Sequence, residues 1–193
     1  IHWEAIHSGQ NFYVARNADL VMLKSIKQGS LHRYVQVKNG FATLADQVFI
    51  KNVDFSPLTI PVLKASTGKW TIGFFPYNNQ GKPLSKEEIF AYPEVENYLN
   101  THKADLLKGK SEEDCPDWYL YGRTQALKDV FTDKYAINTI IKDVESVKLT
   151  PVSAGSGLYS GLYILTTLPY DQLKRFLQHK DFIHYLKMLK NYR

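Results

Sequence analysis

Segments with the apolar alternation of strands and segments with the periodicity of helices come in separate blocks along this chain. Between Gly29 and Phe55, residues 31–37 alternate between apolar and polar side chains, residues 38–40 predict a turn, and residues 47–50 return to strand composition. A doubly wound parallel sheet would need strands and helices in strict alternation. The pattern therefore predicts an α+β fold, with mixed β-sheet regions and helices in blocks.

Farther along the chain, local signals mark further elements. Ser85 and Glu88 have the spacing of a capping box, and Pro93 suits the first turn of a second helix that ends at Gly109. In chain order we expect a hairpin over 62–75 with its loop at 66–68, helices that begin at Ser85 and Pro93, an exposed loop at 108–117, strands at 135–141 and 162–165, a flexible connection at 153–161 between them, and an amphipathic helix from Tyr170.

A chain of 193 residues fits one domain of ordinary size. We therefore expect one domain over 1–193, and the alternative is a division into a β-rich region over residues 1–84 and a helix and strand region over residues 85–193. Ile1 stands where a start methionine would be, and the last helical pattern still runs at Arg193. Both features favour a piece of a longer protein.

Two further properties indicate the cellular location of the chain. The sequence has no apolar run of the roughly 20 residues that a membrane span needs, so we expect no membrane partner. Cys115 is the single cysteine, which excludes an internal disulfide and a cysteine-based metal site. These features favour a reducing, cytoplasmic location.

The sequence predicts no catalytic, metal or cofactor site. The glycines between Gly155 and Gly161 are followed by a strand, whereas a dinucleotide or S-adenosylmethionine loop opens a helix, so a mobile loop is the favoured interpretation. His179 and His184 are five apart on an expected helix and face apart. Neither Cys115 nor any serine has the context of a catalytic nucleophile.

Charge favours an anionic partner instead. The chain has 24 Lys and Arg against 19 Asp and Glu, a net charge of +5. Lys64 and Lys69 flank the 66–68 loop beside Trp70, and these residue types contact phosphates and sugars, although a tight turn around a core tryptophan is equally compatible. The last helix is also basic, and an ordinary solvated surface is its alternative. Its cations are Lys174, Arg175, Lys180, Lys187, Lys190 and Arg193.

Arg123, Thr124 and Gln125 are the best candidates for reading bases. Arg pairs with guanine, and Gln pairs with adenine, through two hydrogen bonds in the major groove. The alternative is a buried arginine that fastens its segment to the neighbouring aromatic cluster. Three residues of the expected flexible connection, where specificity is commonly carried, are added to the candidates: Ser153, Ser156 and Tyr159.

Several of these segments, in this order, resemble the C-terminal specificity region of TaqI-like N6-adenine DNA methyltransferases of restriction-modification systems. The most specific element is Trp-Tyr-Leu-Tyr-Gly-Arg-Thr-Gln, which begins at Trp118. Together the matching segments cover roughly residues 30–165: they are 38–50, 61–69, 75–77, Pro93 with Tyr98 and Leu99, and 118–127.

The resemblance implies a target-recognition domain that binds double-stranded DNA and does no chemistry itself. The family's glycine-rich loop for S-adenosylmethionine and its Asn-Pro-Pro-Tyr catalytic loop are missing from this chain. In the family both lie upstream, so the cofactor and the catalytic methyltransferase domain are expected in the parent chain. The alternative is a protein-interaction module that docks an acidic partner through its basic helix and an aromatic patch of Trp70, Tyr77, Trp118 and Tyr121.

Overall fold

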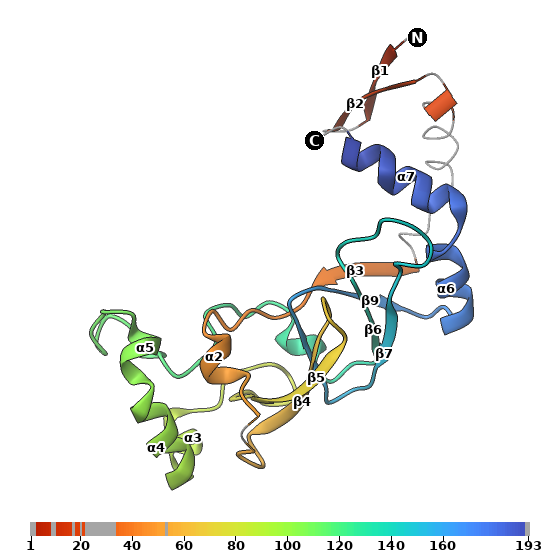
Figure 1. Ribbon diagram of the computed structural model, residues 1–193. Coiled ribbons are helices and arrows are strands. Elements are labelled where there is room, and N and C mark those ends of the chain that lie inside the picture. The colour runs from red at the N-terminus through yellow and green to blue at the C-terminus, as the bar shows by residue number, and fades with distance from the viewer. Residues whose placement is uncertain are drawn as a thin grey trace. The chain divides into compact units, whose positions relative to one another are not determined.

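The computed structural model describes residues 3–8, 11–16, 18–19, 21, 34–52 and 54–191. The chain forms two compact units (Figure 1). Unit 1 comprises Ile1–Gln36, Ile140–Lys148 and Thr166–Arg193, and unit 2 comprises Val37–Thr139 and Leu149–Leu165. Each unit is thus assembled from segments that are distant in sequence.

Two sheets form the framework of unit 2. One has four strands in the order β3-β9-β6-β7, and the other has three in the order β5-β4-β8, with β4 and β8 parallel. The strands are β3 (Val35–Asn39), β4 (Thr59–Lys64), β5 (Lys69–Phe74), β6 (Lys134–Ile137), β7 (Leu149–Val152), β8 (Gly157–Tyr159) and β9 (Leu162–Thr166). Two sheets with several short helices confirm the predicted α+β class.

Short helices complete unit 2, and three of them gather at the end opposite the four-stranded sheet, where Figure 1 draws them in green. The helices are α2 (Asp46–Phe49), α3 (Lys86–Phe90), α4 (Pro93–Thr101), α5 (Lys103–Leu107) and the 3₁₀ turn η2 (Leu127–Asp129). The predicted capping box of α3 is present, since Ser85 Oγ accepts from the Glu88 amide and Glu88 accepts from the Ser85 amide. We call residues 85–117 the helical lobe.

Unit 2 has a large aromatic core beside a smaller aliphatic one. Tyr121 lies at the centre of the aromatic core, with its ring about 5 Å from those of Phe41, Phe49 and Tyr77. Its hydroxyl donates to the Phe74 carbonyl, and burial raises its pKa well above the ordinary value. The smaller core is mainly aliphatic, with Leu63, Ala65, Ala136, Val152 and Leu158, and it also includes the ring of Tyr163.

Unit 1 contains the antiparallel pair β1 (Trp3–Ser8) and β2 (Asn11–Arg16) and the helices α6 (Tyr170–Leu177) and α7 (Lys180–Asn191). The predicted helix from Tyr170 is therefore two helices. Leu173 and Leu177 are buried, as expected for the apolar face of an amphipathic helix, whereas Phe176 is 38% exposed and packs on Phe182 at 5.3 Å between ring centroids. No helix in the described ranges is both long and apolar enough to cross a membrane.

Three expected local structures are wrong. Residues 47–50 lie largely in helix α2 rather than in a strand. The adjacent residues Val48 and Phe49 are both buried, whereas adjacent residues of a strand with one solvent-exposed face point to opposite sides. Lys38 continues strand β3 rather than entering a turn. The connection at 153–161 contains strand β8, which pairs with β4.

Candidate nucleic-acid interface

Three of the predicted DNA-contacting residues lie side by side across the three-stranded sheet. Lys69 of β5 is the register partner of Lys64 of β4, and Lys64 is in turn the partner of Tyr159 of β8. Residues directly opposite one another project from the same face of a sheet, and neighbouring strands are about 5 Å apart. These residues, called the Lys69–Lys64–Tyr159 row below, therefore form one continuous polar and aromatic surface.

Backbone hydrogen bonds in the adjacent hairpin loop and at the end of β4 hold the row in place. The hairpin loop turns back through the Gly68 and Thr67 amides, which both donate to the Lys64 carbonyl, and Gly68 has a positive φ of 74°. Beyond the end of β4, the Ala65 amide donates to the Tyr159 carbonyl at 3.0 Å. The predicted loop at 66–68 is thus confirmed and tied to strand β8.

The side chains of the row differ in exposure. Lys69 is exposed, and Lys64 is half-buried with its ammonium 6.0 Å from the centroid of the Tyr159 ring. Trp70 is 48% exposed, so the alternative of a turn around a core tryptophan is wrong. Because Trp70 follows Lys69 in the strand, it projects from the other face of the sheet.

A second backbone segment extends the row toward Arg123. Phe41 forms a parallel bridge with Tyr159, and the next residue, Ala42, forms an antiparallel bridge with Arg123. Gly157 permits this approach, since an added Cβ would lie 2.5 Å from the Phe41 ring. The Arg123–Gln125 segment is consequently a structural neighbour of the row.

The three predicted base readers of this segment have different surroundings. Arg123 and Thr124 are exposed, so the alternative of a buried arginine is wrong. Gln125 Nε2 donates to the Gly40 carbonyl at 3.1 Å. The amide nitrogen carries two hydrogens, so this bond leaves one N–H and Oε1 available to pair with adenine.

Of the three candidates in the 153–161 segment, the structure exposes Ser153 and buries Ser156. Ser156 is 9% exposed, and its amide donates to the Ser153 carbonyl at 3.2 Å in a turn between β7 and β8. The Gly155 amide donates to the Val130 carbonyl. Ser156 is therefore placed to hold this turn, whereas Tyr159 belongs to the row.

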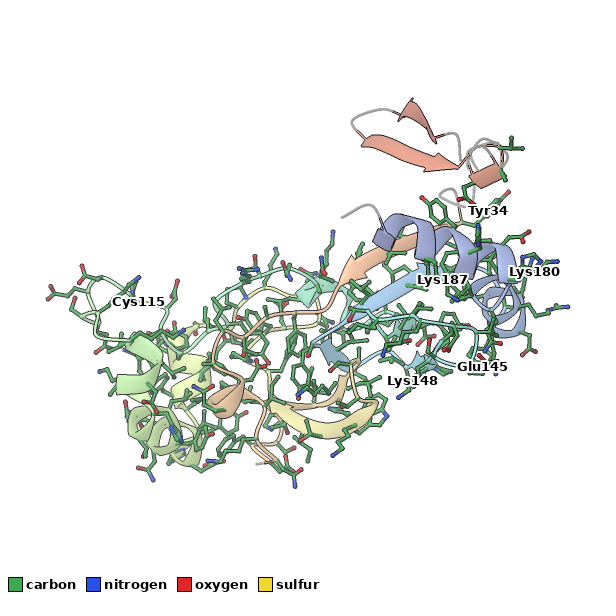
Figure 2. The ribbon with its side chains drawn as sticks, turned by 45° about the horizontal axis from the view of Figure 1, so that its top comes forward. Tyr34, Cys115, Glu145, Lys148, Lys180 and Lys187 are labelled. Atoms are coloured by element: carbon green, nitrogen blue, oxygen red, sulfur yellow. The ribbon has the colours of Figure 1, made fainter. Side chains whose placement is uncertain are left out.

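The predicted basic helix lies in unit 1. Lys187 is exposed on α7, and Figure 2 shows it together with Lys180 on this helix. The side chain of Lys190, like Arg193, lies outside the described residues of the structure. The candidate DNA contacts consequently divide between the row with the Arg123 segment in unit 2 and the basic helix in unit 1.

The structure also reveals a pocket that the sequence did not predict. It is an open hollow of about 430 Å³ beside the row. Its residues come from two segments far apart in sequence, which is why no local pattern marks it. They are Phe41, Ala42, Leu44, Asp46, Gln47, Tyr159 and Ser160.

Charge is unevenly distributed along the chain. The helical lobe has nine acidic and four basic residues, which leaves twenty basic and ten acidic residues in the rest of the chain. Glu112 of the lobe accepts hydrogen bonds from Lys103, Lys86 and the Trp118 indole, which lower its pKa to about 2. Figure 2 shows Cys115 in the same loop.

The aromatic patch on which the protein-docking alternative depends is not present at the surface. Tyr77, Trp118 and Tyr121 are each at most 5% exposed and belong to the core, so only Trp70 of the four is at the surface. Among the described residues, no three His, Cys, Asp or Glu side chains are grouped so that they could hold a metal ion.

Comparison of the sequence with models of known protein families finds no match, and comparison with curated protein sequences finds none.

Proposed function

We propose that this chain is the target-recognition domain of a site-specific N6-adenine DNA methyltransferase. In this proposal it binds double-stranded DNA, while the catalytic domain of the parent chain binds S-adenosylmethionine and transfers the methyl group. The recognition region would hold the duplex while the catalytic domain takes the target adenine out of the base stack.

The observation that carries the proposal is the Lys69–Lys64–Tyr159 row. Like charges that are directly opposite in a sheet repel each other and destabilise it. Lys64 and Lys69 are opposite partners, so the free protein keeps a repulsion that a polyanion would relieve. The net acidic charge of the helical lobe supports this, because it favours one orientation in which the row faces the phosphates and the lobe faces away.

A titration of a fluorescent duplex at several salt concentrations tests the proposal. Each lysine that contacts a phosphate contributes about one unit to the slope of log affinity against log salt. We expect Lys64→Ala and Lys69→Ala each to reduce that slope by about one. Lys110→Ala, an exposed lysine of the helical lobe, is the matched control and should leave the slope unchanged. Unchanged slopes in all three variants would refute the proposed contacts.

The base-reading component of the proposal needs a separate measurement. If Arg123 reads a base, Arg123→Ala should reduce discrimination at one base pair by about 1–3 kcal/mol. Because Arg123 is exposed, the free energy of unfolding should change by less than about 0.5 kcal/mol. The comparison uses the chain fused to its catalytic region and a set of duplexes with single base-pair changes. Equal discrimination in both proteins would exclude Arg123 as a reader.

A further inference from the structure

The pocket beside the row has the chemistry of a site for a flat ring with amino groups. The Phe41 and Tyr159 rings are nearly parallel, with an interplanar angle of 14° and 6.4 Å between centroids. Asp46 and Gln47 add a carboxylate and an amide to the same hollow. Among the described residues, the lining contains no lysine or arginine that could attract a phosphate. The Asp46 carboxylate repels a phosphate, and it can accept a hydrogen bond from an amino group.

Leu44 at the edge of the pocket is held in an unusual conformation. Its φ is 61°, a left-handed conformation that costs a residue with a Cβ roughly 1–2 kcal/mol, and the residue is 52% exposed. The segment is fixed by the Gly122 amide, which donates to the Thr43 carbonyl at 3.0 Å, and by Lys108 Nζ, which donates to the Leu44 carbonyl at 3.1 Å. Packing thus keeps a large apolar side chain at the surface, beside an aromatic pocket.

Hydrogen bonds from neighbouring residues fix the orientation of the Asp46 carboxylate. Thr43 Oγ1 donates to Asp46 Oδ1, and the Ala45 amide donates to Thr43 Oγ1 at 3.1 Å. The negative charge of Asp46 contributes, after burial, to a raised pKa of the Tyr159 hydroxyl. Asp46 and Tyr159 line the same hollow, so both can contact one small ligand.

We propose that this pocket takes one unstacked base of the bound DNA, and that the base is adenine, cytosine or guanine. The inference rests on the proposed function, because the row would supply the phosphate contacts that bring the base to the pocket. The base packs between Tyr159 and Leu44, and its exocyclic amino group donates to Asp46. Thymine fits less well, because its only ring N–H lies between two carbonyl oxygens that the carboxylate repels.

Five duplexes test this proposal: one fully paired, and four that differ only in a single bulged nucleotide, A, C, G or T. Affinities of the whole chain are measured by fluorescence anisotropy at one salt concentration. Stacking and one directed hydrogen bond should make the bulged A, C and G duplexes bind about tenfold tighter than the paired duplex. The bulged T duplex should gain less than about threefold.

Two variants assign the effect to the pocket. Asp46→Asn should remove the difference between T and the other bulged bases, whereas Glu94→Gln, the same loss of charge on the helical lobe, should keep it. Leu44→Gly relieves the left-handed strain, so the fold should be retained, and it should reduce the gain for every bulged base without changing affinity for the paired duplex.

The outcomes separate this inference from the function on which it rests. Tight binding of the paired duplex with no gain from any bulge would overturn the pocket proposal and leave DNA recognition standing. Equal gains for bulged T and bulged A, or an Asp46→Asn variant that behaves like the native chain, would overturn it as well. Failure to bind any duplex would overturn the proposed function and the pocket proposal together.

Discussion

At the scale of single residues, the opposed lysines of the row make stability and binding change in opposite directions. Lys69→Glu replaces the repulsion with Lys64 by an attraction across the hairpin. We expect the free energy of unfolding in urea to rise by about 0.2–1 kcal/mol, and the affinity for duplex DNA to fall. Lys110→Glu is the control for net charge. A Lys69→Glu variant that is less stable, or that binds DNA as the native chain does, would contradict this account.

Lys134 is a buried cation that stabilises the fold by binding backbone carbonyls. Its ammonium donates to the carbonyls of Asp129, Val130 and Thr132 at 2.8–3.1 Å, and burial lowers its pKa only to about 8, so the amine keeps three protons at neutral pH. Lys134→Met retains the size but leaves these acceptors without their donor. We predict a loss of about 2–4 kcal/mol in the free energy of unfolding. Lys128→Met, at an exposed neighbour, should change it by less than about 0.5 kcal/mol.

At the scale of elements, the sequence predicted the helix start that depends on neighbouring residues. It did not predict the strands that depend on contacts with residues distant in the chain. The Ser85–Glu88 box starts a helix because its two hydrogen bonds close within one turn. Residues 38–40 have the composition of a turn, yet Gly40 is needed because an added Cβ would lie 2.5 Å from the Leu158 carbonyl. Strand β8 likewise depends on its pairing with β4, which no local pattern records.

The loop at the end of the helical lobe should respond to acid in a defined range. Glu112 has a pKa of about 2, below the ordinary value of 4.5, so its contribution to stability is complete above pH 4.5 and is lost as pH falls through about 2. The Trp118 indole N–H donates to Glu112 at 3.0 Å. Its NMR signal should therefore titrate with a midpoint near pH 2 and should not titrate in Glu112→Gln. A midpoint near 4.5 would show that the bridges are not formed.

At the scale of the molecule, the candidate site depends on how the chain is assembled from distant segments. The sequence singled out Lys64, Lys69 and Tyr159 one by one, and the parallel pairing of β4 with β8 brings them together. The pocket arises in the same way, from residues 41–47 and 159–160. The sequence already concentrates acidic residues between 85 and 117, and the fold gathers this segment into one helical lobe while Lys64 and Lys69 lie on strands; such a separation of charge orients a protein on a polyanion.

Chemical footprinting of lysines would test this orientation over the whole chain. Lysines are acetylated with and without a duplex, and mass spectrometry compares their reactivity. We expect DNA to protect Lys64, Lys69 and Lys187 several-fold, and to leave Lys110 of the helical lobe unprotected, because phosphates approach the basic surfaces and avoid the acidic one. Added salt should abolish the protection, since counterions compete for the same sites. Protection of Lys110 as strong as that of Lys64 would mean that the charge separation does not orient the chain, and protection confined to Lys187 would place the contact on helix α7 alone.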